Sequence, residues 1–321
     1  MRSRVKVIAI LALLLSMALP ANAITDGEPD GAAHPQVGQL LFFVPDAIDP
    51  RFDDPGGWFS CSGTLLADKV VLTAGHCTFA VGLGGETTNE AKSPLVDTDD
   101  DGDPDNGTGG NDIWVNFNEA PDFSILDPSD SYAPDHNEQR YNDWTAALNA
   151  SVEWHRGTAN PHPDYNDNLF VLADAGIVEL DTSPGVASTH FAVLPSEGHL
   201  DQYVNARRNE TRFTPVGYGL NTGFPTFLGG DTRESASVML VSLQGTYGIP
   251  TGTSVVFSGN PGKAHQGGTC FGDSGGPVFE GDSTLIVAVT SFGVTLNCAE
   301  PGGYYRIDQD DDLDFINDHL S

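Results

Sequence analysis

The feature that most constrains the fold is a succession of short apolar runs, each rich in β-branched or aromatic residues and bounded by Gly, Pro, Asn or Asp. Such runs predict β-strands, because branched and aromatic side chains pack well on a pleated sheet and the bounding residues favour turns. Many short strands with few helical periods predict an all-β barrel or sandwich. The clearest predicted strands are Gln39–Val44, Gly63–Leu66, Val70–Thr73, Gly176–Leu180, Val238–Leu243, Ser254–Phe257, Thr284–Ser291 and Tyr304–Ile307.

Two segments depart from this pattern. Near the C-terminus, the spacing of apolar residues in Asp312–Leu320 predicts a short helix with one apolar face. Between Cys77 and Tyr141, apolar runs are scarce and Asp, Asn, Gly and Pro are frequent. That composition predicts an elaborated surface loop rather than a part of the core.

Within this loop, carboxylates recur in a pattern typical of calcium-binding loops. Oxygen donors fall at positions one, three, five and nine, and Gly102 at position six allows the turn. Position twelve is Thr108, so the bidentate glutamate of an EF-hand is missing. We expect a structural calcium ion, with a solvated acidic loop as the alternative. The candidate ligands are Asp97, Asp99, Asp101, Asp103 and Asp105.

The first 23 residues have the features of a secretory signal peptide. Arg2, Arg4 and Lys6 precede an apolar run that ends at Leu19, and small residues close the segment at Ala23. No later stretch reaches the roughly 18 apolar residues that a transmembrane helix needs. We therefore expect a secreted chain, extracellular or periplasmic, with no membrane association after signal cleavage.

The chain is strongly acidic, with 14 Lys and Arg against 45 Asp and Glu and a formal net charge of −31. The mature chain is more acidic still, since the signal peptide holds three of the basic residues and none of the acidic ones. Such a surface repels phosphate groups, which argues against nucleic acid and anionic membranes as partners. We expect the mature protein to be a monomer.

Four cysteines, Cys61, Cys77, Cys270 and Cys298, occur in this exported chain. An even number in an oxidising compartment predicts disulfides, and four cysteines allow three pairings. Zinc sites use more closely spaced cysteines, typically C-x-x-C, so a zinc site is disfavoured.

The stretch Gly267–Val278, with the sequence GGTCFGDSGGPV, places Ser274 in a tight glycine-rich turn. A serine hydroxyl becomes an effective nucleophile only beside a base, and the oxyanion that forms needs hydrogen-bond donors. The turn suits the second need, because the backbone N–H groups of Gly272 and Ser274 can point together. Taken alone, the stretch is equally typical of a flexible surface turn.

His76 is the best candidate for the base. It follows an apolar strand directly in Val70–Cys77, VVLTAGHC, whereas most of the other histidines lie in polar loops. A disulfide through Cys77 would fix the end of that strand and limit the movement of the imidazole, as a catalytic base requires.

Together, LTAGHC and GDSGGP resemble the chymotrypsin/trypsin family of serine endopeptidases. The likeness extends over CSGTLLADKVVLTAGHC, HPDYNDNLFVLADAGIVEL and PVGYGLN, where Tyr218 replaces a Trp of the family. The resemblance implies an all-β fold of two packed antiparallel six-stranded barrels with a short C-terminal helix. It implies a single peptidase domain over residues 24–321. The first barrel would span about 24–190, with the loop 78–141, and the second about 191–321.

The resemblance also implies a catalytic triad in which Ser274 attacks, His76 is the base and Asp174 orients His76. Asp174 precedes the apolar run Ala175–Leu180, so it is expected to be buried. Gly272 and Ser274 would form the oxyanion hole. Catalysis would need no cofactor. The implied disulfides are Cys61–Cys77 and Cys270–Cys298.

The same alignment implies a specificity pocket without a carboxylate at its base, where Gly268 stands in place of the Asp of trypsin-like members. An open neutral pocket favours a large apolar residue before the scissile bond and disfavours Arg and Lys. Glu300 would reverse this preference if its carboxylate turned inward. The implied pocket residues are Gly268, Thr269, Ser291, Phe292, Gly293 and Gly302.

In the family, a newly formed amino terminus folds in and pairs with the Asp before the catalytic Ser. Here Ile24 follows the predicted signal-peptidase site directly, so signal cleavage alone would release the ammonium that pairs with Asp273. We therefore expect no propeptide.

These expectations describe a secreted serine endopeptidase that acts on protein or peptide substrates. Within enzymes, the alternatives are an esterase and a narrow processing peptidase. From another class, the alternative is a catalytically silent relative that acts as a calcium-dependent binding or adhesion protein.

Overall fold

The computed structural model of the chain describes residues 24–25, 27–45, 47–81, 112–165, 172–203, 211–222, 228–244, 252–259, 267–293, 295–298 and 300–321. The predicted signal peptide, residues 1–23, and the predicted calcium ligands, Asp97 to Asp105, lie outside these residues. Both remain predictions.

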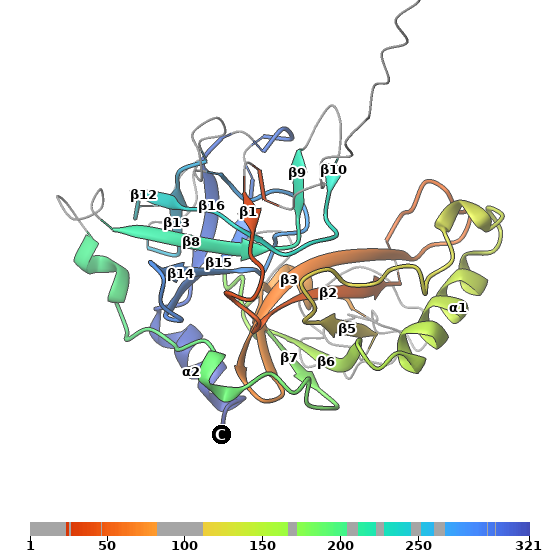
Figure 1. Ribbon diagram of the computed structural model, residues 1–321, viewed down its shortest axis with the longest axis horizontal. Coiled ribbons are helices and arrows are strands. Elements are labelled where there is room, and N and C mark those ends of the chain that lie inside the picture. Colours follow the sequence, from red (N-terminus) through yellow and green to blue (C-terminus); the bar gives the residue numbers. More distant parts are fainter. Residues whose placement is uncertain are drawn as a thin grey trace, which may run out of the picture.

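The first half of the chain forms a closed barrel of six antiparallel strands, seen at the right of Figure 1. Its interior is filled by inward-facing apolar side chains, among them Leu40, Leu65, Val71 and Val178. In barrel order the strands are β2 (Val37–Val44), β3 (Gly57–Ala67), β4 (Val70–Thr73), β7 (Gly176–Leu180), β6 (His155–Pro161) and β5 (Ile113–Asn116).

The second half forms a sheet in which β14 also pairs with β8, so that six strands make a second ring. The ring order is β8 (Arg212–Gly217), β12 (Val238–Ser242), β13 (Ser254–Phe257), β16 (Gly302–Arg306), β15 (Ile286–Phe292) and β14 (Pro277–Glu280). Short strands extend or flank it: β1 (Glu28–Pro29), β11 (Glu234–Ser235), β9 (Leu220–Thr222) and β10 (Leu228–Gly229). The predicted all-β fold with two six-stranded barrels is confirmed.

A shared apolar cluster joins the two barrels. It combines Leu72 and Ile177 of the first barrel with Val216, Phe279 and Ile286 of the second. The predicted C-terminal helix, α2 (Asp310–Asp318), is also confirmed, and its Ile316 belongs to the same cluster. Both barrels bury residues in this cluster, which is called the seam below. Side chains of either barrel that lie beside the seam therefore keep fixed positions relative to one another.

The expectation that Cys77–Tyr141 is only a surface loop is wrong. Strand β5 lies within it and is buried throughout, with Trp114 completely inaccessible. A second helix, α1 (Asn137–Ala150), begins in it and lies at the outer side of the first barrel (Figure 1). Its Arg140 is buried and its Nη1 contacts Asp49 Oδ2 at 3.0 Å. Tertiary contacts therefore stabilise a helix whose sequence is mostly polar.

Short 3-10 helices occur at Gly75–Cys77 (η1), Ser129–Ser131, Ser188–His190 and His199–Tyr203. In the part of the chain that the structure describes, neither α-helix is long and apolar enough to cross a membrane.

Candidate active site

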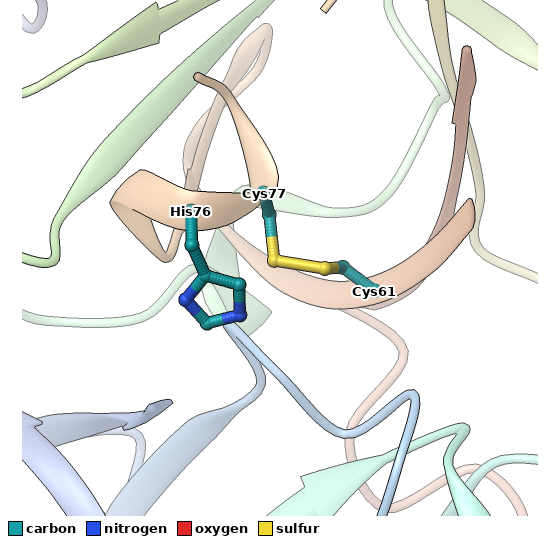
Figure 2. A group of neighbouring side chains, drawn as sticks. All are labelled: Cys61, His76 and Cys77. Carbon is teal, nitrogen blue, oxygen red and sulfur yellow. A yellow bond between two sulfur atoms is a disulfide. The ribbon is translucent and has the colours of Figure 1, made fainter. Parts of the chain in front are cut away.

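His76 lies in the 3-10 turn η1, immediately after strand β4 of the first barrel. The adjacent Cys77 is bonded to Cys61 of β3 with an S–S distance of 2.01 Å, and Figure 2 shows the imidazole beside this disulfide. The bridge ties the turn to the barrel wall, as expected. Cys61, His76 and Cys77 also have the proximity of a metal-binding group. Since both sulfurs form the disulfide, neither is available as a thiolate ligand.

Asp174 is completely buried and bonds to His76 through both of its oxygens. The imidazole Nδ1 lies 3.0 Å from each oxygen, and the backbone N–H of His76 donates to Oδ1 at 2.9 Å. Ser291 of β15 donates its hydroxyl to Oδ2 at 2.5 Å. The sequence assigned Ser291 only to the pocket wall, so its contact with Asp174 was missed. Together these bonds fix the orientation and tautomer of the imidazole.

The pKa of His76 is raised above its usual 6.5. Burial disfavours the imidazolium, but the charge of Asp174 and its hydrogen bond favour it and outweigh the burial. The imidazole is thus a stronger base than one in water. A quarter of the side chain is exposed, so the ring remains accessible to a substrate.

Ser274 lies in the turn that enters strand β14 of the second barrel. Its carbonyl accepts the N–H of Ser62 in β3 at 2.7 Å, and the next residue, Gly275, donates its N–H to Thr290 in β15 at 2.7 Å. The turn is therefore attached to both barrels. His76 and Ser274 line the same two cavities. Among the hydrogen bonds of the described residues, none joins the side chains of His76 and Ser274. Such bonds are often long before a substrate binds.

Gly272 has a left-handed backbone with φ of 98°. A Cβ at this position would lie 2.9 Å from the Cα of Gly219, so only glycine fits without a shift. Its carbonyl accepts the hydroxyl of Ser62 at 3.0 Å, which holds the peptide in place. Within the described chain, the N–H groups of Gly272 and Ser274 have no acceptor, so both are free to donate to a ligand.

The geometry is that of two barrels bringing a carboxylate, an imidazole and a hydroxyl to their seam. A family model described as Trypsin matches residues 136–311, which is more than half of the chain. The chain belongs to the trypsin family. It is therefore a serine endopeptidase, and protein chains are its class of substrate.

A solved structure described as HL collagenase has the same fold. It matches with a TM-score of 0.57 and 17% identity, and the match covers 92% of this chain and 98% of that one. At this identity the match supports the fold and not a shared substrate. Among curated proteins, no sequence matches this trypsin-family chain.

A cavity of about 480 Å³ lies beside Ser274 and His76, where the specificity pocket is predicted. Five of its six predicted residues line it: Thr269, Ser291, Phe292, Gly293 and Gly302. The sixth, Gly268, is not among the lining residues, and its role at the base of the pocket stays a prediction. Gly268 is buried and exchanges two backbone hydrogen bonds with Thr25, each of 3.1 Å. Glu300 is exposed and lies at the rim of the cavity as its one carboxylate among the described lining residues.

Tyr304, which the sequence did not single out, supports the pocket from behind. Its hydroxyl lies 2.9 Å from Thr269 Oγ1, and burial raises its pKa to about 12, so it stays neutral. A Cβ on Gly302 would approach both hydroxyl groups to within 3.3 Å. Glycine at 302 therefore keeps this wall open.

In the full chain the Ile24 nitrogen is a peptide N–H, so the pairing of a free Ile24 ammonium with Asp273 stays a prediction. The Ile24 nitrogen donates to Glu234 Oε2 at 3.0 Å, and not to Asp273. Asp273 accepts the N–H groups of Gly219 and Cys270, both at 2.8 Å. Burial raises its pKa to about 8; these hydrogen bonds oppose the rise and the charge of Glu234 adds to it. Glu234 and Asp273 are thus two buried carboxyl groups that interact electrostatically, and Glu234 accepts from Ile24.

Both implied disulfides are present. Cys270–Cys298 has an S–S distance of 2.01 Å and joins the segment before Ser274 to the loop at the pocket rim. Cross-links of this kind restrict the conformations of the unfolded chain. Each thereby stabilises the folded state by about 2–4 kcal/mol. They hold His76 and the pocket wall in place.

Proposed function

We propose that this chain is a secreted endopeptidase that hydrolyses peptide bonds through an acyl-enzyme on Ser274. Ser274 Oγ attacks the scissile carbonyl carbon while His76 Nε2 accepts its proton. The N–H groups of Gly272 and Ser274 stabilise the oxyanion, and His76 then protonates the departing amine. Water repeats the sequence on the ester and releases the acid.

The observation that supports this proposal most strongly is the buried contact between Asp174 and His76. A carboxylate that accepts from Nδ1 leaves Nε2 unprotonated and able to take the proton of Ser274. The hydroxyl of Ser291 and the backbone N–H of His76 hold the carboxylate in that orientation. Acid–base catalysis by a positioned imidazole of this kind contributes about 10²–10⁴-fold.

The pH dependence of kcat/KM tests the role of His76. Only the neutral imidazole can accept a proton, so activity is expected to fall about tenfold per pH unit below the pKa of His76. Since that pKa is raised, the fall should begin at a higher pH than for a free imidazole. Asp174→Asn removes the charge that favours the imidazolium, so its acid limb should move to lower pH while its maximal rate falls about 10⁴-fold. An unchanged acid limb in the variant would contradict the assignment.

We infer that the residue before the scissile bond is large and apolar. The cavity beside Ser274 is lined by hydroxyl, aromatic and glycine residues, and a neutral lining gives Arg or Lys no buried partner. Glu300 is exposed at the rim, where water screens its charge.

A peptide library tests this preference. We expect cleavage after Phe, Tyr, Leu or Met to exceed cleavage after Arg or Lys by about 100-fold, since an unpaired buried cation is strongly disfavoured. Glu300→Gln should leave the order of preference unchanged. Preferred cleavage after Arg that disappears in Glu300→Gln would show that the carboxylate turns into the pocket.

Maturation is proposed to follow from signal cleavage after Ala23. In the full chain the Ile24 nitrogen is a peptide N–H, and after cleavage it would be an ammonium at the same buried place, beside Glu234 and near Asp273. A cation there would compensate two buried carboxyl groups at once. Because Asp273 accepts N–H groups from Cys270 and Gly219, its position fixes the turn that leads to Gly272 and Ser274.

A further inference from the structure

A second cavity, here called the leaving-side cleft, opens on the other side of Ser274. Its volume is about 650 Å³, larger than that of the specificity pocket. His76, Phe271 and Ser274 line both cavities, so the two meet at the reacting groups. A substrate whose scissile carbonyl lies at Ser274, with the preceding residue in the specificity pocket, must continue across the leaving-side cleft.

The cleft is strongly apolar. Apart from the catalytic groups, its lining is mostly aromatic or aliphatic and includes Phe42, Trp58, Phe59, Phe79 and Leu220. Phe59 is 46% exposed and Phe271 is 47% exposed, although both are large apolar side chains. Isolated exposed apolar residues are ordinary, but two that flank one cavity beside a nucleophile indicate a binding surface.

The walls of the cleft are held in place by contacts within the protein itself. Phe59 lies directly opposite Phe42 in the β2–β3 ladder, and their rings stack with centroids 6.1 Å apart. On the other wall, Phe79 packs on Tyr165 at 5.2 Å. The Cys61–Cys77 disulfide joins the strand of Phe59 to the turn of His76. A preformed apolar site loses little entropy on binding, so its contacts contribute fully to affinity.

Helix α1 extends this surface. A neighbouring cavity of about 310 Å³ shares Trp58, Phe59 and Leu220 with the cleft and reaches Arg140 and Trp144 of α1. Trp144 in turn packs on Trp58, with ring centroids 5.2 Å apart. The helix therefore supports the wall of the cleft and lengthens the groove away from Ser274.

We propose that the leaving-side cleft binds the substrate segment after the scissile bond and selects a large apolar or aromatic residue in its first two positions. This inference rests on the proposed role of Ser274. Phe59 is its central specificity residue, and Phe271 separates the cleft from the pocket for the preceding residue. The enzyme thus reads apolar side chains on both sides of the bond that it cleaves.

Quenched fluorescent peptides test the proposal. The peptides share one segment before the scissile bond and carry Phe, Leu, Gly or Asp at the first or second position after it. We expect kcat/KM to be about tenfold or more higher for Phe than for Gly in at least one of these positions, as for other apolar pockets. In Phe59→Ala this ratio should fall to about threefold or less. Val152→Ala, at a site 89% exposed and outside both cavities, should keep the wild-type ratio.

A p-nitroanilide with the same acyl segment has no residue after the scissile bond. It therefore distinguishes a failure of the cleft proposal from a failure of the proposed function of Ser274. Wild-type enzyme that cleaves the anilide but cleaves Phe, Gly and Asp peptides equally would overturn the cleft proposal alone. Enzyme that cleaves neither the anilide nor the peptides would overturn the proposed function and the cleft with it. A ratio that stays high in Phe59→Ala would remove Phe59 from the proposal and assign the preference elsewhere.

Discussion

Replacing Ser274 by alanine is expected to lower kcat for peptide hydrolysis by about 10⁵-fold or more, to a rate set by the oxyanion donors and substrate binding alone. The loss is this large because the substitution removes the nucleophile that His76 activates. Steady-state cleavage of an apolar peptide by both forms measures it. The fold should be unaffected, since the side chain of Ser274 makes no hydrogen bond within the described chain.

Serine at position 62 provides a matched control for this substitution. Ser62→Ala also removes one hydroxyl close to the site, one that bonds to the Gly272 carbonyl and accepts the Tyr218 N–H, both at 3.0 Å. It should weaken activity through the position of Gly272 and not through loss of the nucleophile, so covalent labelling of Ser274 should survive. Equal loss of labelling in both variants would contradict the assignment of the nucleophile.

The second large effect concerns the amino terminus. Glu234→Gln is expected to lower kcat/KM by about 30-fold or more, because the mature ammonium loses a buried partner. The alkaline limb should also move to lower pH: an ammonium held by carboxylates deprotonates above its usual pKa of about 8, and losing one carboxylate lowers that value. A pH profile of wild type and variant measures both effects. Glu28→Gln, an exposed acid on the neighbouring strand β1, is the matched control.

The state of the amino terminus can also be followed by stability. The pKa of Asp273 is raised to about 8 in the chain in which Ile24 is a peptide N–H, so ionising this carboxyl costs stability as pH rises from about 4 to 8. Once the ammonium is present, that cost should disappear. Uncleaved protein should therefore lose stability across this range, and mature protein should not. Secreted, active protein that begins downstream of Ile24 would contradict the maturation scheme.

Much of the barrel architecture could be predicted from local sequence. Val70–Thr73, Gly176–Leu180 and Ser254–Phe257 have the predicted bounds, because each is a β-branched run ended by turn residues. Helix α1 could not be found in this way. Its polar sequence is helical because Arg140 is buried on Asp49 and Trp144 packs on Trp58, contacts made with residues more than 80 positions away.

The candidate site likewise combines residues that have a local sequence signal with residues that only the tertiary structure brings together. His76, Asp174 and Ser274 stand in motifs with local signatures, so the sequence alone indicated them. Glu234 had no such signal: it lies in a two-residue strand, and only the three-dimensional fold brings it to Ile24, 210 positions away. The leaving-side cleft is likewise assembled from separate segments. A run such as Gly57–Phe59 gives no indication that its Phe59 lines the same cavity as Ser274.

Labelling with a fluorophosphonate, followed by peptide mapping, tests the central claim most directly. In the reaction Ser274 Oγ forms a bond to phosphorus, fluoride leaves, and His76 takes the hydroxyl proton, so only a serine with a working base reacts quickly. The account predicts one label per mature chain, placed on Ser274, lost in Ser274→Ala and strongly slowed in Asp174→Asn. A mature chain that stays unlabelled, or one labelled at another residue, would contradict it.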